Sequence, residues 1–117
     1  MLRVYSARTA EELEHARILL LEEAAGPDID ELPGPYAPPR GRLLVAEWQG
    51  RLAGCVTIAP LEGPVCAMSR LYVRAAERQH GIGRRLAASA FHEACVIGYR
   101  AVRCSSGAFV ALSTRDK

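Results

Sequence analysis

The side chains with the clearest chemical potential lie in one short stretch, an Arg-x-x-Gly-x-Gly pattern formed by Arg78, Gly81 and Gly83. Glycines lack a Cβ atom, so the chain can turn tightly and bring backbone N–H groups close to a bound group. An amphipathic segment follows at once, and the N-terminus of a helix attracts negative charge through its dipole. His80 and Arg84 add side-chain hydrogen-bond donors at the same place. The pattern therefore predicts a pocket for a phosphorylated cofactor.

Two better-known phosphate-binding patterns do not fit this turn. The P-loop requires Gly-x-x-x-x-Gly-Lys-Ser/Thr, and the sequence contains no lysine before Lys117. The dinucleotide fingerprint requires a third glycine where Leu86 stands, and an acid about 20 residues further on. Residues 94–115 contain no acid. A glycine turn that only joins a strand to a helix stays open as an alternative on spacing alone.

The first third of the chain is predicted to contain a strand, a helix and an irregular connection. Residues 2–6 alternate as a short strand does, and Thr9 with Glu12 forms a capping-box pattern before a helix from Ala10 to Ala25. The acidic side chains of this helix are expected to form a solvent-exposed face. Residues 26–41 contain five prolines, which indicate an irregular connection.

A β-hairpin and a further strand are predicted to lead into the glycine turn. Two apolar runs within residues 42–60 flank Gln49-Gly50, a pair that is typical of a tight hairpin turn. Residues 65–73 form the next apolar, β-branched segment. At its end we expect Arg70 and Arg74 to be solvent-exposed charges.

Beyond the glycine turn, the sequence predicts a helix and then one or two strands. Apolar residues recur at helical spacing until Gly98, which is typical of a helix C-terminus. Residues 99–104 form a strand pattern, and residues 108–112 are predicted to return as a short final strand after a turn at Ser105-Ser106-Gly107. The predicted order is β, α, β, β, β, α, β, with this additional strand at the end.

At this point the sequence resembles a known family. Arg78-x-x-Gly81-x-Gly83, preceded by LYV and followed by RRLAASAFHEACVIGYRAVR, is similar to the acetyl-coenzyme A motif of the GCN5-related N-acetyltransferases (GNAT). The resemblance extends over nearly all of residues 2–104. It implies an α+β, three-layer fold in which helices flank a mixed, mainly antiparallel sheet. It also implies that the fourth and fifth strands splay apart and hold acetyl-CoA in the gap.

The resemblance assigns roles to ten residues. The backbone of Leu71, Tyr72 and Val73 would pair with the pantetheine arm, and an N–H of this strand would polarise the thioester carbonyl. The pyrophosphate would be held by Arg78, Gln79, His80, Gly81, Ile82, Gly83 and Arg84. A primary amine of a small molecule or peptide would then attack the thioester directly, and the family needs no metal.

The C-terminal part of the sequence departs from the family pattern. Members usually continue past the fifth strand through a helix that supplies a tyrosine general acid, whereas Cys104 is followed here by SSGAFVALSTRDK. Ala67 stands where close relatives tend to carry Glu before Met. We therefore expect a shortened C-terminus and assign no catalytic residue. The alternatives are an active enzyme, completed by its own tail or by a second subunit in a homodimer, and an impaired or non-catalytic acyl-CoA-binding member.

Composition sets the remaining expectations. The chain has 117 residues, half of them apolar, which favours a single domain over 1–117. It has no apolar run near 18 residues and no signal-peptide core, so we expect a cytoplasmic protein without a membrane partner. Seven arginines in 70–103 create a cationic region, but no stacking aromatics are interleaved with them, which argues against nucleic-acid binding. Reduced, mostly buried thiols are expected for Cys55, Cys66, Cys95 and Cys104.

Overall fold

The computed structural model describes residues 1–105 and 107–112. Its centre is a six-stranded sheet in which the strands lie in sequence order. Within the described ranges β4 and β5 are parallel and the other neighbouring strands are antiparallel. The strands are β1 (Leu2–Ser6), β2 (Arg42–Trp48), β3 (Arg51–Pro60), β4 (Val65–Val73), β5 (Ala101–Cys104) and β6 (Phe109–Ala111).

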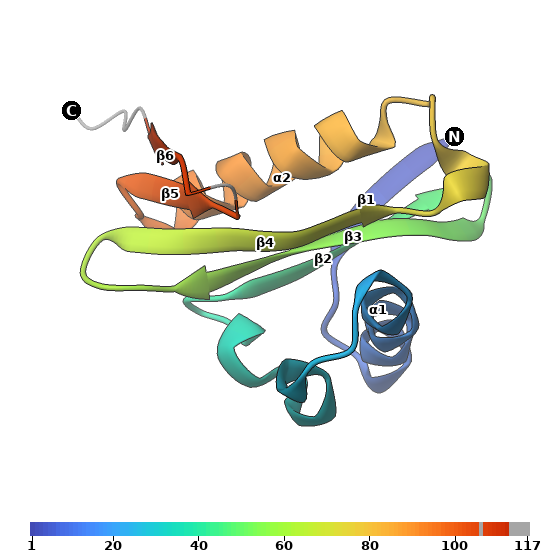
Figure 1. The fold of residues 1–117 in the computed structure, drawn as a ribbon, viewed down its shortest axis with the longest axis horizontal. Coiled ribbons are helices and arrows are strands. Elements are labelled where there is room, and N and C mark those ends of the chain that lie inside the picture. The colour runs from blue at the N-terminus through green and yellow to red at the C-terminus, as the bar shows by residue number, and fades with distance from the viewer. Residues whose placement is uncertain (106, 113–117) are drawn as a thin grey trace.

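Helices cover both faces of the sheet, which gives three layers (Figure 1). Helix α2 (Ile82–Ile97) lies on one face and α1 (Ala10–Glu23) on the other. Three short 3₁₀ turns complete the connections: η1 (Pro27–Glu31), η2 (Gly34–Tyr36) and η3 (Ala75–Glu77). The predicted α+β class, the mixed, mainly antiparallel sheet and the order of elements are therefore confirmed. None of the helices described is long and apolar enough to cross a bilayer.

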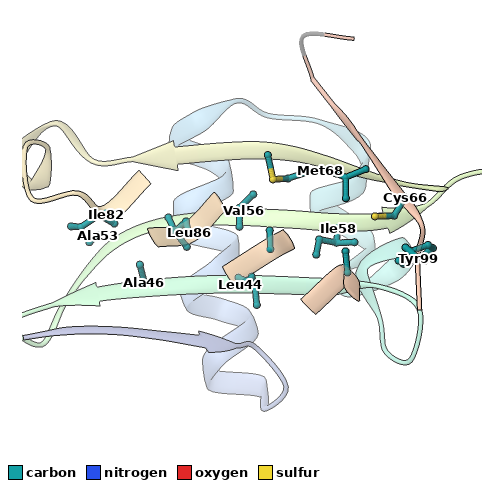
Figure 2. Close-up of a cluster of buried hydrophobic side chains, with 13 residues drawn as sticks. Leu44, Ala46, Ala53, Val56, Ile58, Cys66, Met68, Ile82, Leu86 and Tyr99 are labelled. Atoms are coloured by element: carbon teal, nitrogen blue, oxygen red, sulfur yellow. The ribbon is translucent and has the colours of Figure 1, made fainter. Parts of the chain in front are cut away.

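Each face of the sheet carries its own hydrophobic core. Successive residues of β2 and β3 are buried on opposite faces, because side chains alternate along a strand. Leu44 and Val56 therefore pack with Leu86 under α2, whereas Val45 and Cys55 pack under α1. Figure 2 shows the side of the sheet that faces α2, with Leu86 close to Val56 of β3. Truncating a buried leucine such as Leu86 to alanine costs about 2–5 kcal/mol.

Two element boundaries differ from the prediction. Helix α1 ends at Glu23 instead of Ala25, because Ala24 has extended backbone angles although its N–H still bonds to the carbonyl of Leu20. Strand β5 begins at Ala101 instead of Tyr99. The ring of Tyr99 is buried in the core, and its N–H bonds to the carbonyl of Ala94 and so closes α2.

The predicted final strand is present and covers the edge of β5. Strand β6 pairs antiparallel with β5, from Ala101 opposite Ala111 to Arg103 opposite Phe109. The predicted turn before it includes Ser106, which lies outside the described residues, as do residues 113–117. The edge of β5 is thus covered within this chain, which is one of the two alternatives that the sequence left open; a homodimer stays a prediction.

The cysteines are free thiols, in part as predicted. Cys55 and Cys66 are buried, and burial raises the pKa of their thiols to about 12 and about 11. The expectation of mostly buried thiols was wrong for Cys95, which is exposed, and Cys104 is half-buried. Cys95 lies on the solvent-exposed side of α2.

Strand β4 bends where the sheet opens. Between Ser69 and Tyr72, β4 spans one residue more than the facing segment of β3, and Arg70 in this bulge has φ +57°. A bulge of this kind kinks a strand and increases its twist. The pairing with β5 runs only as far as Met68, opposite Cys104, so residues 69–73 have no described partner on that side. The pairing ends because β5 itself ends at Cys104, so residues 69–73 have a free edge, and a gap between two diverging strands stays a prediction.

Candidate functional site

The predicted glycine turn connects β4 to α2 through a loop in an unusual conformation. After η3, Gln79 and Gly81 both have positive φ, at 76° and 74°. The left-handed region costs a residue with a Cβ about 1–2 kcal/mol, whereas glycine enters it freely. Gly81 is the N-cap of α2, so the chain reaches the helix through a position that suits glycine.

The N-terminus of α2 has no side-chain cap. Gly81 has no side chain to offer, and the first bond of the helix runs from the N–H of Arg85 to the carbonyl of Gly81. The N–H groups of the preceding three residues therefore have no partner within the helix. The first turn contains no acidic residue. Positive charge opposes the dipole here, so Arg84 and Arg85 suit a helix end that receives an external anion.

A hollow of about 390 Å³ opens in front of this helix end. It brings together seven of the ten residues predicted for cofactor binding, namely Val73, Arg78, Gln79, Gly81, Ile82, Gly83 and Arg84. The other three lie nearby. Leu71 is exposed on β4, the hydroxyl of Tyr72 bonds to Glu22 across the α1 face, and the ring of His80 stacks on Trp48.

The free edge of β4 presents backbone groups to the side of the sheet edge where this hollow lies. The N–H of Arg74 donates to the carbonyl of Ala53 in β3, and the polar groups of successive residues alternate in direction along a strand. Those of Val73 therefore point away from β3. The carbonyl of Val73 indeed accepts a hydrogen bond from Nε of Arg78, at 3.0 Å. The polar groups of Val73 thus lie on the free edge of β4, where an extended ligand could add as a strand.

A second hollow, of about 260 Å³, lies where β4 leaves β5. It is lined by residues at the end of β5 and before the bulge of β4, namely Ala67, Met68, Ser69, Arg103, Cys104 and Ser105. The two hollows therefore lie on β4, one at its C-terminal end and one at its bulge, with the free edge between them. Such an arrangement suits a long ligand with an anionic end.

On the α1 side of the bulge, Arg70 joins elements that are distant in sequence. Its guanidinium donates to both carboxylate oxygens of Asp28, at 2.9 and 3.0 Å, and to Glu23. Its side chain is only 12% exposed. This arginine holds the pKa of Asp28 below its usual value, and the hydroxyl of Tyr36 donates to the same carboxylate at 2.6 Å. Arg70 thus links the bulge to the connection that follows α1.

A parallel ion pair lies next to it. Arg74 donates to both oxygens of Glu22, at 2.9 and 2.7 Å, and the hydroxyl of Tyr72 donates to Glu22 at 3.0 Å. The expectation of solvent-exposed charges was therefore wrong for Arg70 and Arg74, whereas Glu22 and Glu23 at the end of α1 are exposed as predicted and also engage in these ion pairs. The pairs join residues 42 to 52 positions apart, and no local pattern in the sequence indicates them.

These features agree with the family comparison. The acetyltransferase (GNAT) family model matches residues 6–107. The chain belongs to this family. The resemblance noted in the sequence is therefore confirmed, and the match extends through the glycine turn, α2 and β5.

The uncharacterized N-acetyltransferase YjgM of Escherichia coli K12 is 32% identical over 89 residues. These residues are 74% of this chain and 53% of YjgM, so the chain spans about half the length of this curated relative.

Solved GNAT structures share the fold at low sequence identity. A GNAT acetyltransferase from Staphylococcus aureus Mu50 superposes with a TM-score of 0.75 at 13% identity, over 89% of this chain and 72% of that one. The structure of AAC(6′)-Iy, in complex with the bisubstrate analogue CoA-S-monomethyl-acetylneamine, gives a TM-score of 0.73 at 19% identity. That likeness covers 90% of this chain and 79% of the other. At such identities the comparison establishes the fold.

Proposed function

We propose that the chain binds acetyl-CoA and transfers its acetyl group to a primary amine of a small molecule or peptide. The observation that carries the proposal is the hollow at the uncapped start of α2, which the predicted pyrophosphate residues line. A diphosphate there would accept hydrogen bonds from the free N–H groups of the helix. The positive charges of Arg78 and Arg84 would attract it. Membership of the GNAT family and the CoA-containing analogue in AAC(6′)-Iy support the choice of ligand.

The rest of the ligand would follow the free edge of β4. The pantetheine arm is expected to pair with the backbone of Leu71, Tyr72 and Val73 as an added strand. Its thioester would then reach the bulge, next to the hollow lined by Ser69 and Cys104. A single extended ligand with a diphosphate at one end would thus occupy both hollows.

The reaction requires positioning and charge stabilisation. The amine nitrogen attacks the carbonyl carbon of the thioester, and negative charge develops on the carbonyl oxygen. A backbone N–H of β4 near the bulge would be the donor to that oxygen. The C–S bond then breaks, coenzyme A leaves as a thiolate that takes up a proton, and the nitrogen loses a proton to become the amide.

An acyl-CoA-binding protein without turnover is the second candidate, and one observation favours it. The carboxylates on the α1 side of β4 are engaged by arginines, and Arg74 and Arg70 hold the pKa values of Glu22 and Asp28 below their usual range. A carboxylate with a lowered pKa is a weak proton acceptor. No general base is therefore assigned among these groups.

Two measurements separate the candidates. Calorimetric titration with acetyl-CoA tests binding, and release of the free CoA thiol across a panel of primary amines and peptides tests turnover. Binding with amine-dependent release supports the transferase. Binding without release from any amine supports the second candidate, and failure to bind acetyl-CoA contradicts both.

A further inference from the structure

The tip of the β2–β3 hairpin contacts, through two residues, the segment 77–81 that leads into α2. We call this segment the cofactor loop. Trp48 and Arg51 face each other across the tight turn at Gln49-Gly50. The ring of Trp48 stacks on that of His80, with centroids 4.5 Å apart and an interplanar angle of 12°. Arg51 donates two hydrogen bonds, at 3.0 and 3.1 Å, to the carboxylate of Glu77.

These contacts hold the loop at both of its ends. Glu77 closes η3 at the start of the loop and is buried at 6% exposure, whereas His80 directly precedes Gly81. Between them Gln79 adopts the left-handed conformation, which disfavours residues with a Cβ. The stack and the ion pair therefore supply fixed contacts for a segment whose backbone is strained.

We propose that Trp48 is a positioning residue for the cofactor loop, acting through its stack on His80. The inference rests on the proposed function, because the loop has to be held for the diphosphate of CoA. It also changes the role predicted for His80. The imidazole is packed against Trp48, and its contribution to anion binding is to fix the backbone that presents the N–H groups of α2.

The experiment uses coenzyme A as the probe and the full chain. Trp48→Leu removes the aromatic surface, and we expect it to weaken CoA binding about tenfold. The free energy of one aromatic stack corresponds to a change in affinity of about this size. Trp48→Phe keeps a flat ring and is expected to stay within about threefold of the parent. The double variant Trp48→Leu with His80→Ala should bind no more weakly than either single variant, since both remove the same stack.

Trp48 is the single tryptophan of the chain, so its fluorescence reports on the stack directly. His80→Ala should change the emission and weaken CoA binding, whereas the control His92→Ala, on the exposed side of α2, should change neither. If the parent does not bind CoA, the proposed function fails. If the parent binds CoA but Trp48→Leu and His80→Ala bind equally well, or His80→Ala leaves the emission unchanged, the positioning role is overturned.

Discussion

The two long helices of this protein begin in opposite ways. At the start of α1, the Thr9 hydroxyl accepts a hydrogen bond from the N–H of Glu12, and the Glu12 carboxylate accepts from the N–H groups of Thr9 and Arg8. At the start of α2, glycine replaces the capping side chain and arginines replace the acids. The first helix end is satisfied by its own chain, whereas the second leaves its donors for an anion. On the proposed function, this difference separates a structural helix start from one that would bind an anion.

Of the changes proposed here, Gly81→Val is expected to have the largest effect, a loss of CoA affinity at the start of α2. A valine at φ +74° strains the loop, and a Cβ at this position points into open space, where we place the diphosphate. Strain and the loss of charge-assisted hydrogen bonds together predict a fall in CoA affinity of roughly 100-fold or more by calorimetry.

Gly63→Val is the matched control for this substitution. Gly63 also has positive φ, and a Cβ there would meet no atom within 4 Å, but this glycine lies in the turn between β3 and β4. The substitution should lower stability by a similar amount and leave CoA affinity unchanged. Parent-like binding by Gly81→Val would place the anion elsewhere.

Arg84→Gln tests the charge at the second helix start. Arg84 lines the hollow, so its loss should weaken CoA binding by about five- to tenfold and reduce the dependence of affinity on salt. Arg85→Gln changes the charge of the same helical turn, but Arg85 lines a different hollow, between α2 and β1. An equal effect of the two substitutions in calorimetric titrations would show that only the general field of the helix end matters.

Thr9→Ala tests the first helix start. Loss of the capping hydroxyl should lower the free energy of unfolding by about 1 kcal/mol in a denaturant titration. CoA affinity should not change, because the cap is part of α1 on the opposite face of the sheet. A variant with unchanged stability, or with weakened CoA binding, would remove the distinction between the two helix ends.

Low pH should weaken the cap of α1, and this is the smallest of the four predicted effects. The N–H groups of Arg8 and Thr9 lower the pKa of Glu12 below its usual 4.5. The resulting stability is present above pH 4.5 and is lost as the pH falls through the lower pKa of the folded protein. Glu12→Gln should therefore flatten the loss of stability that denaturant titrations measure below pH 4.5.

The features predictable from sequence are those with local causes. Thr9 and Glu12 indicate the first cap within four residues, and the spacing of Arg78, Gly81 and Gly83 indicates the loop and its hollow. The pairs of Arg70 with Asp28 and of Trp48 with His80 depend on strand register and on the bulge of β4. Contacts of that kind arise only when the sheet is assembled, so the sequence predicted neither the ion pairs nor the stack.

We place the diphosphate of CoA at the uncapped start of α2. The most direct test is a backbone amide NMR titration with CoA and, separately, with pantetheine, which lacks the phosphates. We predict that CoA shifts the amide signals of Ile82 and Gly83 strongly, that pantetheine does not, and that the amide of Glu12 responds to neither. Binding of CoA that leaves the Ile82 and Gly83 amides unmoved would contradict the claim.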